Sequence, residues 1–273
     1  MSYEQWLRSA SASLKSVDIP SARLDSELLL GFSIKKPRHY IIAHPEEQLP
    51  TAQLQRLNKL LKRRVNREPI AYILGYKEFY GRDFMVSPSV LIPRPESETI
   101  IAMFTKYNLA GRVLDIGTGS GCIGLTLKAE HPTIHLTVSD ISASALEVAR
   151  KNAKRLEIKP IRYIQSDLLE YWLSHEKPKK FDVIIANLPY VDNRWQVSPE
   201  TAFEPAGALF SEESGMEHIK RLFVQIPGLL KRNGHLIIEA DPRQHKKLSK
   251  YAEKSGLYPI HKEDFIVLYT YLG

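Results

Sequence analysis

The sequence is poor in several features that would each indicate a particular class of protein. Its 273 residues include one cysteine, Cys122, which excludes an internal disulfide and any zinc site built from several cysteines. No apolar run reaches the roughly 18 to 20 residues of a membrane-spanning helix. The first residues, MSYEQWLRSASASLKS, have neither the pattern of a signal peptide nor that of a transit peptide. We therefore expect a cytoplasmic protein with no membrane contact.

Metal ligands, internal repeats and low-complexity segments are also scarce. His131 and His135 lie four residues apart, but Pro132 and the strand pattern that follows keep them off one helix face, so we expect no metal site. With 43% hydrophobic and 25% charged residues, the composition is that of an ordinary globular protein. The length allows one large domain and a smaller one.

Positive charge is in excess and lies mainly in the first third of the chain. The net charge is +7, and residues 1–80 contain 13 Lys and Arg against 8 Asp and Glu, a difference of +5. The densest basic run is KLLKRRVNRE, residues 59–68. Such a region either faces RNA or a partner that works beside RNA, or is the solvated face of a helix. The sequence leaves both interpretations open.

The apolar periodicity changes twice along the chain. Residues 1–74 show three- and four-residue spacing, which predicts a small helical bundle with Ser21 and Thr51 as N-caps. Residues 75–95 are aromatic and β-branched with Gly and Pro between them, which predicts a hairpin linker. Residues 96–273 alternate strands with helices, which predicts an α/β domain with a mostly parallel sheet covered on both faces.

The segment VLDIGTGSGCIG predicts a ligand-binding loop. It follows a predicted strand, precedes a helix, and contains the glycine patterns of loops whose backbone turns tightly and approaches a nucleotide-like ligand. A dinucleotide and S-adenosylmethionine both suit it. The residues of this loop that we expect to contact the cofactor are Gly117, Thr118, Gly119, Ser120 and Gly121.

Three carboxylates near strand ends extend this predicted site. Asp115 lies in an apolar strand, so we expect it to accept hydrogen bonds from the loop or to lie near the ligand's amino group. Asp140 ends the next strand, where it can hold both ribose hydroxyls or serve only as a helix N-cap. Asp167 and the backbone of Leu168 can meet an adenine edge, although a plain turn carboxylate is an equal alternative.

The end of the strand FDVIIA favours methyl transfer over hydride transfer. Asn187 should project into the crevice beyond the carboxyl ends of the strands. Its side-chain oxygen and the main-chain carbonyl of Leu188 can hold the two hydrogens of a planar NH2 and aim its lone pair at a sulfonium methyl. Pro189 restricts Leu188 to extended backbone, and Tyr190 can stack on the planar group. Because the Asn187 amide is neutral, it would also avoid placing a buried anion beside the cofactor's own carboxylate.

These residues together resemble a known family. LDIGTGSG, DISASALEVARKNA and IIANLPYV, preceded by REPIAYILGYKEFYGRDFMVSPSVLIPRPESE, are similar to the release factor glutamine methyltransferases of the HemK/PrmC type. The resemblance runs from about Arg67 to the C-terminus. It implies a Rossmann-like S-adenosylmethionine-dependent methyltransferase domain, with a helical N-terminal domain that binds the substrate protein and a hairpin linker.

The resemblance also implies the reaction and further site residues. The family methylates the side-chain nitrogen of the glutamine in the GGQ motif of class I peptide-chain release factors, using S-adenosylmethionine. By similarity, Asn187 to Tyr190 hold the glutamine amide, and Pro93 and Arg94 line the entrance of the site. Asn187 also lies beside the cofactor. We expect a monomer with no stable nucleic-acid binding.

The sequence departs from the family pattern at three places. The family usually has NPPY, PRPETE and a late strand that ends in Glu-Ile-Gly, whereas this chain has Leu188, Ser97 and the segment IIEADPRQ. NLPY resembles the motif of rRNA adenine dimethyltransferases, so N6-adenine methylation of RNA or DNA is the alternative function. A nicotinamide-dependent dehydrogenase or a non-catalytic nucleotide binder is a more distant one.

Overall fold

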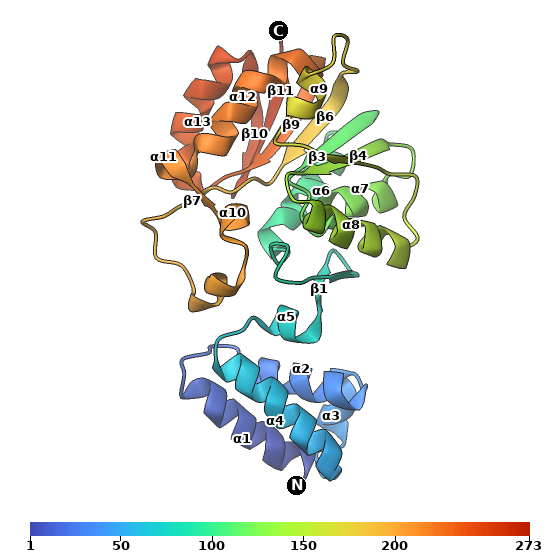
Figure 1. The fold of residues 1–273 in the computed structure, drawn as a ribbon, viewed down its shortest axis with the longest axis vertical. Helices are drawn as coiled ribbons and strands as arrows, with labels where there is room; N and C mark the ends of the chain where they lie inside the picture. The colour runs from blue at the N-terminus through green and yellow to red at the C-terminus, as the bar shows by residue number, and fades with distance from the viewer. The chain divides into compact units, whose positions relative to one another are not determined.

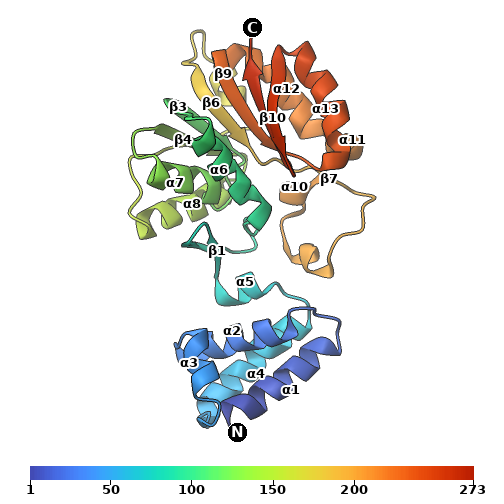
Figure 2. The same cartoon turned by 180° about the vertical axis from the view of Figure 1, so that it is seen from behind.

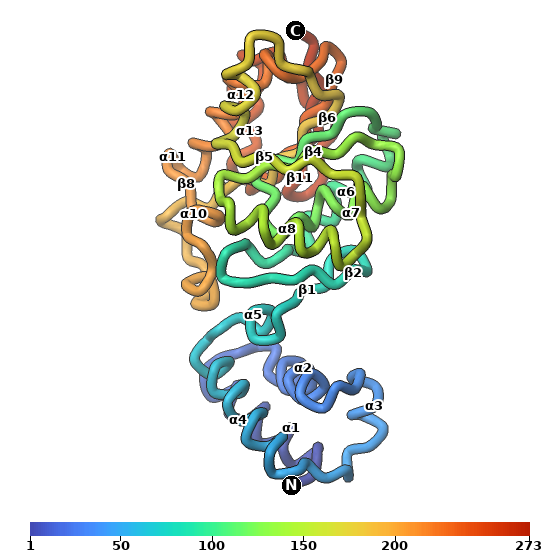
Figure 3. Tube along the Cα trace, turned by 45° about the vertical axis from the view of Figure 1, so that its right-hand side comes forward, coloured from blue at the N-terminus to red at the C-terminus, as the bar shows by residue number.

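The computed structural model describes residues 1–273, and contact density divides them into two compact units. The helical unit contains residues 1–75 and 198–203, and the sheet unit contains residues 76–197 and 204–273. The predicted boundaries at residues 74 and 95 differ from this division. The hairpin belongs to the sheet unit because Asn152 bonds both the amide and the carbonyl of Met85. Figure 3 shows the hairpin running close to α8.

The helical unit is built from amphipathic helices that bury one face each. Its elements are α1 (Tyr3–Lys15), α2 (Ala22–Ile34), α3 (Arg38–Ala43), α4 (Thr51–Val65), α5 (Ile70–Leu74) and the short 3₁₀ turn η2 (Pro199–Phe203). α1 begins with a capping box in which Ser2 and Gln5 bond each other's backbone amides. Ser21 is the N-cap residue of α2, as predicted, although its side chain makes no capping bond. The prediction for Thr51 is wrong, because Pro50 holds the N-cap position and Thr51 is the first residue of α4.

A buried ion pair crosses the helical unit. The Arg64 Nε donates to the Asp25 Oδ2 at 2.7 Å, and the side chains are 6% and 3% exposed. Arg64 also pairs with Glu200 at 3.1 Å, as does Arg67 at 3.3 Å. Residues 198–203 therefore group with the helices, and part of the basic run in α4 has a structural role. Lys59 and Lys62 stay exposed.

The sheet unit contains a seven-stranded sheet in the order β10-β11-β9-β6-β3-β4-β5. Its strands are β3 (Arg112–Ile116), β4 (His135–Asp140), β5 (Arg162–Gln165), β6 (Phe181–Ala186), β9 (Leu230–Glu239), β10 (Leu257–Glu263) and β11 (Ile266–Tyr271). β9, β6, β3, β4 and β5 are parallel, and β11 and β10 complete the sheet in antiparallel pairing. The predicted α/β fold with a mostly parallel sheet is confirmed.

One edge strand, β10, was not predicted. It contains Pro259, which has no N–H to donate, and a bulge follows between Pro259 and His261. Proline is tolerated at a sheet edge but weakens a sequence-based strand prediction.

Helices cover both faces of the sheet, as Figures 1 and 2 show from opposite sides. One apolar core packs Ile184 and Leu236 against α12 and α13, and the other packs Val183 and Ile237 against α6, α7 and α8. Neighbouring residues of a strand thus point to opposite cores. These helices are α6 (Glu98–Lys106), α7 (Cys122–Glu130), α8 (Ala143–Arg155), α12 (Glu217–Leu229) and α13 (Pro242–Lys254).

Shorter elements complete the sheet unit. The hairpin pairs β1 (Tyr76–Phe79) with β2 (Arg82–Met85), and a second small pair joins β7 (Val191–Asp192) to β8 (Phe210–Ser211). The remaining turns are η1 (Pro95–Ser97), α9 (Glu170–Leu173), α10 (Ala206–Leu209) and α11 (Glu212–Gly215). None of the helices is long and apolar enough to cross a membrane.

The Arg64–Asp25 pair gives a prediction about the stability of the helical unit. We expect Arg64→Met to cost about 3–5 kcal/mol, because it leaves the Asp25 carboxylate buried without its partner. Hydrogen exchange of the α2 and α4 amides measures this loss. Arg63→Met is the matched control, since it removes a more exposed pair with Glu68 that is worth about 0–1 kcal/mol. Equal effects of the two substitutions would contradict the assignment.

Candidate active site

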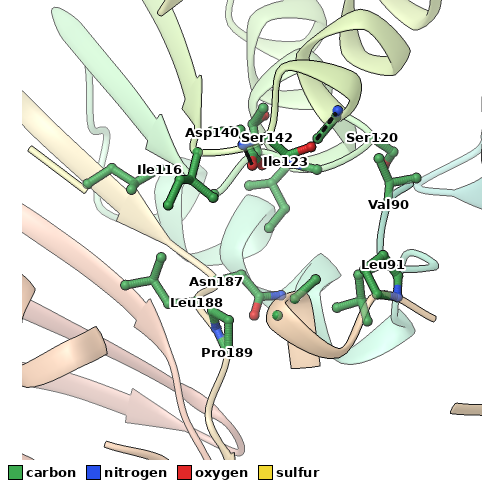
Figure 4. A pocket seen from close by; sticks show the side chains of 18 of the residues that line it. Val90, Leu91, Ile116, Ser120, Ile123, Asp140, Ser142, Asn187, Leu188 and Pro189 are labelled. Carbon is green, nitrogen blue, oxygen red and sulfur yellow. Dashed lines mark hydrogen bonds between the residues drawn. The ribbon is translucent and has the colours of Figure 1, made fainter. Parts of the chain in front are cut away.

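A cavity of about 460 Å³ opens at the carboxyl ends of the parallel strands. Figure 4 shows Asn187, Leu188 and Pro189 at the end of β6, across the cavity from Asp140 and Ser142. The structure brings most of the predicted site residues to this cavity: Pro93, Arg94, Gly117, Thr118, Gly119, Ser120, Asp140, Asp167, Leu168, Asn187, Leu188 and Pro189 line it. Asp115, Gly121 and Tyr190 do not line it.

The glycine loop has the conformation expected of a ligand cradle. Gly119 has φ of +54°, and a Cβ built on it would meet no atom within 4 Å. Glycine at this position leaves room for a ligand against the backbone. Gly124 is needed for packing inside the protein, because a Cβ there would lie 2.8 Å from the Asp115 Oδ2. It makes room for a buried carboxylate.

Asp115 holds the glycine loop by hydrogen bonds on its buried side. Its Oδ2 accepts hydrogen bonds from the Thr118 hydroxyl at 2.6 Å and from the Gly124 amide at 3.1 Å. The residue is 1% exposed, and burial raises the pKa of its carboxyl group to about 7. The predicted hydrogen bonds to the loop are present. Direct contact with the cofactor has no support, because Asp115 lies outside the cavity lining.

Asp140 ends β4 and lines the cavity. Its two carboxylate oxygens accept from the amides of Gly119 and Ser142, each at 2.9 Å, so it ties the glycine loop to the start of α8. The N-cap of α8 is Ser142 itself, which bonds the Ala145 amide. Since each carboxylate oxygen has a second lone pair, Asp140 can still accept hydrogen bonds from the hydroxyl groups of a ligand. Burial raises its pKa.

Asp167 and Leu168 lie at the end of β5. The Asp167 carboxylate pairs with Arg221 at 2.7 Å, which holds it against α12. Leu168 has a φ of +45°, a left-handed conformation that is uncommon for leucine, and its side chain is buried. Both residues line the cavity, and an adenine contact remains a prediction.

Asn187 is held by a buried hydrogen-bond network. Its side-chain nitrogen donates to the Ser97 hydroxyl at 3.1 Å and to the Glu239 Oε2 at 3.0 Å. The Ser97 hydroxyl donates to the same Glu239 oxygen at 2.6 Å. The Ser97 oxygen and the Glu239 Oε2 lie 2.6 Å apart, too close for each to take a different hydrogen of the planar NH2, so they share one N–H of Asn187. The Asn187 nitrogen therefore faces the protein, and its side-chain oxygen remains able to accept hydrogen bonds from a ligand.

The network bears on two expectations. Asn187 is the neutral group that we expected at this position, and behind it lies the carboxyl group of Glu239, which is 1% exposed and whose pKa is raised by burial. Tyr190 does not line the cavity, since its hydroxyl donates to the Glu239 Oε1 at 2.9 Å and its ring packs against an apolar core. The predicted stacking of Tyr190 on a substrate therefore has no structural support.

Arg94 lines the cavity and is anchored by a second buried acid. Its guanidinium lies 2.6 Å from Glu204, whose side chain is 2% exposed and also accepts from the Ile92 amide at 3.0 Å. Glu204 thus fixes the segment before η1 that forms one wall of the cavity.

Sequence reasoning missed three residues of this site: Ser97, Glu204 and Glu239. The available signal for Glu239 was an acid at the end of the apolar strand GHLIIE, the same signal that led to Asp115. Cys122 lines the cavity but is buried, and burial raises its pKa to about 12, in keeping with a packing role. No group of three His, Cys, Asp or Glu side chains is arranged to hold a metal ion.

Comparisons with known proteins agree with this geometry. Residues 5–75 match the family described as PrmC N-terminal domain, and residues 95–204 match the methyltransferase small domain. The release factor glutamine methyltransferase of Koribacter versatilis is 42% identical over 89% of both chains. The Escherichia coli release factor glutamine methyltransferase is 37% identical over 88% of this chain and 86% of its own. The chain belongs to this family.

Solved structures support the fold. The 16S rRNA methyltransferase of Thermus thermophilus, in complex with AdoMet and guanosine, has a TM-score of 0.53 and 15% identity, covering 72% of this chain and 50% of its own. A methyltransferase of Pyrococcus furiosus has a TM-score of 0.52 and 18% identity, covering 79% and 100%. At these identities the likeness shows the methyltransferase fold alone.

The cofactor of this family member is S-adenosylmethionine, and the cavity fits it. The open space beside Gly119 and the carboxylate of Asp140 lie where a nucleoside and its ribose are held in such folds. When bound, the cofactor supplies a methyl group on a positively charged sulfur. The residues that would hold it are those of the glycine loop together with Asp140.

The buried carboxyl of Asp115 gives a pH prediction. Its folded-state pKa of about 7 exceeds an unfolded value of about 3.9, so the folded protein binds the extra proton. The stability that this group contributes is therefore present at low pH and lost as the pH rises towards 7. Urea unfolding at pH 5 and pH 8 should show a larger loss in the parent protein than in Asp115→Asn. Asp83→Asn, at an exposed carboxylate, is the control, and equal pH dependence in all three proteins would refute the prediction.

Leu188 gives a prediction that separates stability from chemistry. Its side chain is buried in the core behind β6, and its Cδ2 lies 3.2 Å from where a Cβ on Gly117 would be. Leu188→Ala should lower the free energy of unfolding by about 2–5 kcal/mol. The rate of methyl transfer should stay within about threefold at a temperature where the variant is folded, because the main-chain carbonyl remains. Leu173→Ala, at an exposed leucine, is the control for stability, and a stable variant with a lost rate would contradict this account.

Proposed function

We propose that this protein transfers a methyl group from S-adenosylmethionine to the side-chain amide nitrogen of the glutamine in the GGQ motif of class I peptide-chain release factors. The observation that carries the proposal is the orientation of Asn187, whose nitrogen is tied inward to Glu239 and Ser97. An amide held in this way offers its oxygen to a substrate NH2. Membership of the release factor glutamine methyltransferase family identifies that NH2.

The chemistry required of the protein is positioning. The amide nitrogen is a weak nucleophile because its lone pair is delocalised. The Asn187 side-chain oxygen and the Leu188 carbonyl can accept its two hydrogens and direct the lone pair along the axis of the carbon–sulfur bond. The bound cofactor would supply the methyl group and leave with the electrons of its carbon–sulfur bond, and the amide nitrogen would give up one proton to water as it gains the new carbon. No strong base is needed.

The neighbouring walls fit a protein loop as substrate. Pro93, Arg94 and Pro205 line the cavity beside Asn187, and Arg94 is fixed by Glu204 rather than free to pair with a phosphate. We propose that the helical unit recognises the release factor. We also propose a cytoplasmic monomer without stable nucleic-acid binding.

Mass spectrometry of a purified release factor incubated with this protein and S-adenosylmethionine tests the function. We expect the GGQ glutamine to gain one methyl group, and Asn187→Ala to slow the reaction by about 100-fold or more, since a lost hydrogen-bonding group at a reacting centre costs about that much. A release factor with alanine in place of that glutamine is the control.

The same mixture can be offered rRNA or DNA as a competing substrate. Methylated adenine beside an unmodified glutamine would reject the proposal and favour N6-adenine methylation. Tight NADH binding with none for S-adenosylmethionine would reject both.

A further inference from the structure

We propose that Glu239 and Ser97 are positioning residues for methyl transfer: they lock the Asn187 amide with its nitrogen toward the protein and its oxygen toward the substrate, and they strengthen that oxygen as an acceptor. The inference rests on the proposed function, because it concerns how the same site holds a substrate NH2. Glu239 does not line the cavity, so its effect must pass through Asn187, whereas Ser97 lines the cavity and contacts Asn187 there.

The need for a lock follows from the shape of the asparagine side chain. Its C=O and NH2 groups are almost equal in size, so rotation by half a turn exchanges an acceptor for two donors. In the wrong orientation, NH2 would face the NH2 of the substrate. Productive binding therefore requires something that distinguishes the two orientations.

The buried network makes this distinction. In the observed orientation, the Asn187 nitrogen donates to the Ser97 hydroxyl at 3.1 Å and to the Glu239 Oε2 at 3.0 Å. The Ser97 hydrogen is used on Glu239, at 2.6 Å, so the Ser97 oxygen can only accept from Asn187. A reversed amide would place its oxygen against the oxygens of Glu239 and Ser97. It would lose two hydrogen bonds and set an acceptor beside a carboxylate.

The fold fixes Glu239 in this position. β6 and β9 are parallel neighbours in which Ala186 pairs with Ile238, so the next residues along, Asn187 and Glu239, lie side by side at the strand ends. The Tyr190 hydroxyl donates to the other oxygen of Glu239 at 2.9 Å. Three donors thus surround a carboxyl group that is 1% exposed. Burial raises the pKa of this carboxyl group, and the three donors act in the opposite direction by holding its oxygens as acceptors.

The hydrogen bond from Asn187 to Glu239 has a second consequence. Hydrogen bonds in series polarise one another when water is excluded, and the Glu239 oxygen draws on the Asn187 N–H. The amide of Asn187 then carries more negative charge on its oxygen. This favours the transfer step, in which the substrate nitrogen loses electron density to the new bond and its hydrogens become more positive.

Two pairs of variants test the proposal in the full chain. Ser97→Thr keeps the hydroxyl and Ser97→Ala removes it, while Glu239→Gln keeps an acceptor of the same shape and Glu239→Met keeps only the volume. The turnover number should fall about tenfold in Ser97→Ala, which removes one hydrogen bond to Asn187. It should fall about 100-fold in Glu239→Met, which removes the other bond to Asn187 and also the acceptor that orients the Ser97 hydroxyl. Ser97→Thr should stay within about threefold, and Glu239→Gln should lie between the extremes.

Other readouts separate positioning from general damage. The affinity for S-adenosylmethionine, measured by calorimetry, should stay within about threefold in all four variants, because the glycine loop and Asp140, which would hold the cofactor, are unaltered. Asp182→Asn is the matched control, since it removes another carboxylate of the sheet, at the opposite end of β6. It should keep the parent turnover number. In an Asn187→Ala background, Glu239→Gln should cause no further loss, because the residue it positions is absent.

The outcomes distinguish this inference from the proposed function. If the parent protein does not methylate the release factor, the proposed function fails. If the parent protein is active and Glu239→Met or Ser97→Ala turns over at the parent rate, only the positioning role is overturned. Independent, additive losses from Asn187→Ala and Glu239→Gln would overturn it as well. Should Glu239→Met fail to fold, the Ser97 pair and Glu239→Gln decide the question.

Discussion

The hydrogen-bonded register of β6 with its two neighbours determines where the chemistry of this protein lies. Ile116 of β3 pairs with Ala186 of β6, and Ala186 pairs with Ile238 of β9. The next residues along therefore lie at the same level, at the carboxyl ends of the three strands. These are Gly117 of the cofactor loop, Asn187 and Glu239. A slip of one residue would turn each side chain to the other face of the sheet and separate the three groups.

Buried carboxylates hold the loops that leave this edge. Asp115 fixes the glycine loop through Thr118 and Gly124. Glu239 fixes the Asn187 segment, and Glu204 fixes the entrance segment through Ile92 and Arg94. A buried carboxylate is costly unless donors surround it, so each loop that supplies donors is bound tightly to its acid. The walls of the cavity are thereby held by acids whose side chains face the protein, while the Asn187 oxygen and the carboxylate of Asp140 are left for the ligand.

Much of this arrangement could be predicted from local sequence. The apolar runs of β3, β4 and β6, the glycine loop and Asn187 all depend on residues close together in the chain, where periodicity and turn chemistry are informative. The missed interactions join distant residues. Ser97 and Glu239 are 142 positions apart, and Ile92 and Glu204 are 112 apart. The direction of the Tyr190 side chain depends on its hydrogen bond to Glu239, and no local pattern reveals that partner. The sequence therefore predicted a stacking role that the structure does not support. β10 was not predicted, because Pro259 interrupts the strand pattern in its sequence.

The central claim is that the oxygen of Asn187, and not its nitrogen, receives the substrate NH2. A crystal structure of the protein with S-adenosylhomocysteine and a GGQ-containing release factor tests it most directly. The account predicts the glutamine nitrogen within hydrogen-bonding distance of the Asn187 side-chain oxygen and the Leu188 carbonyl, with the Asn187 nitrogen still bonded to Glu239 and Ser97. A glutamine that contacts the Asn187 nitrogen, or an amide that has left Glu239 on binding, would contradict it.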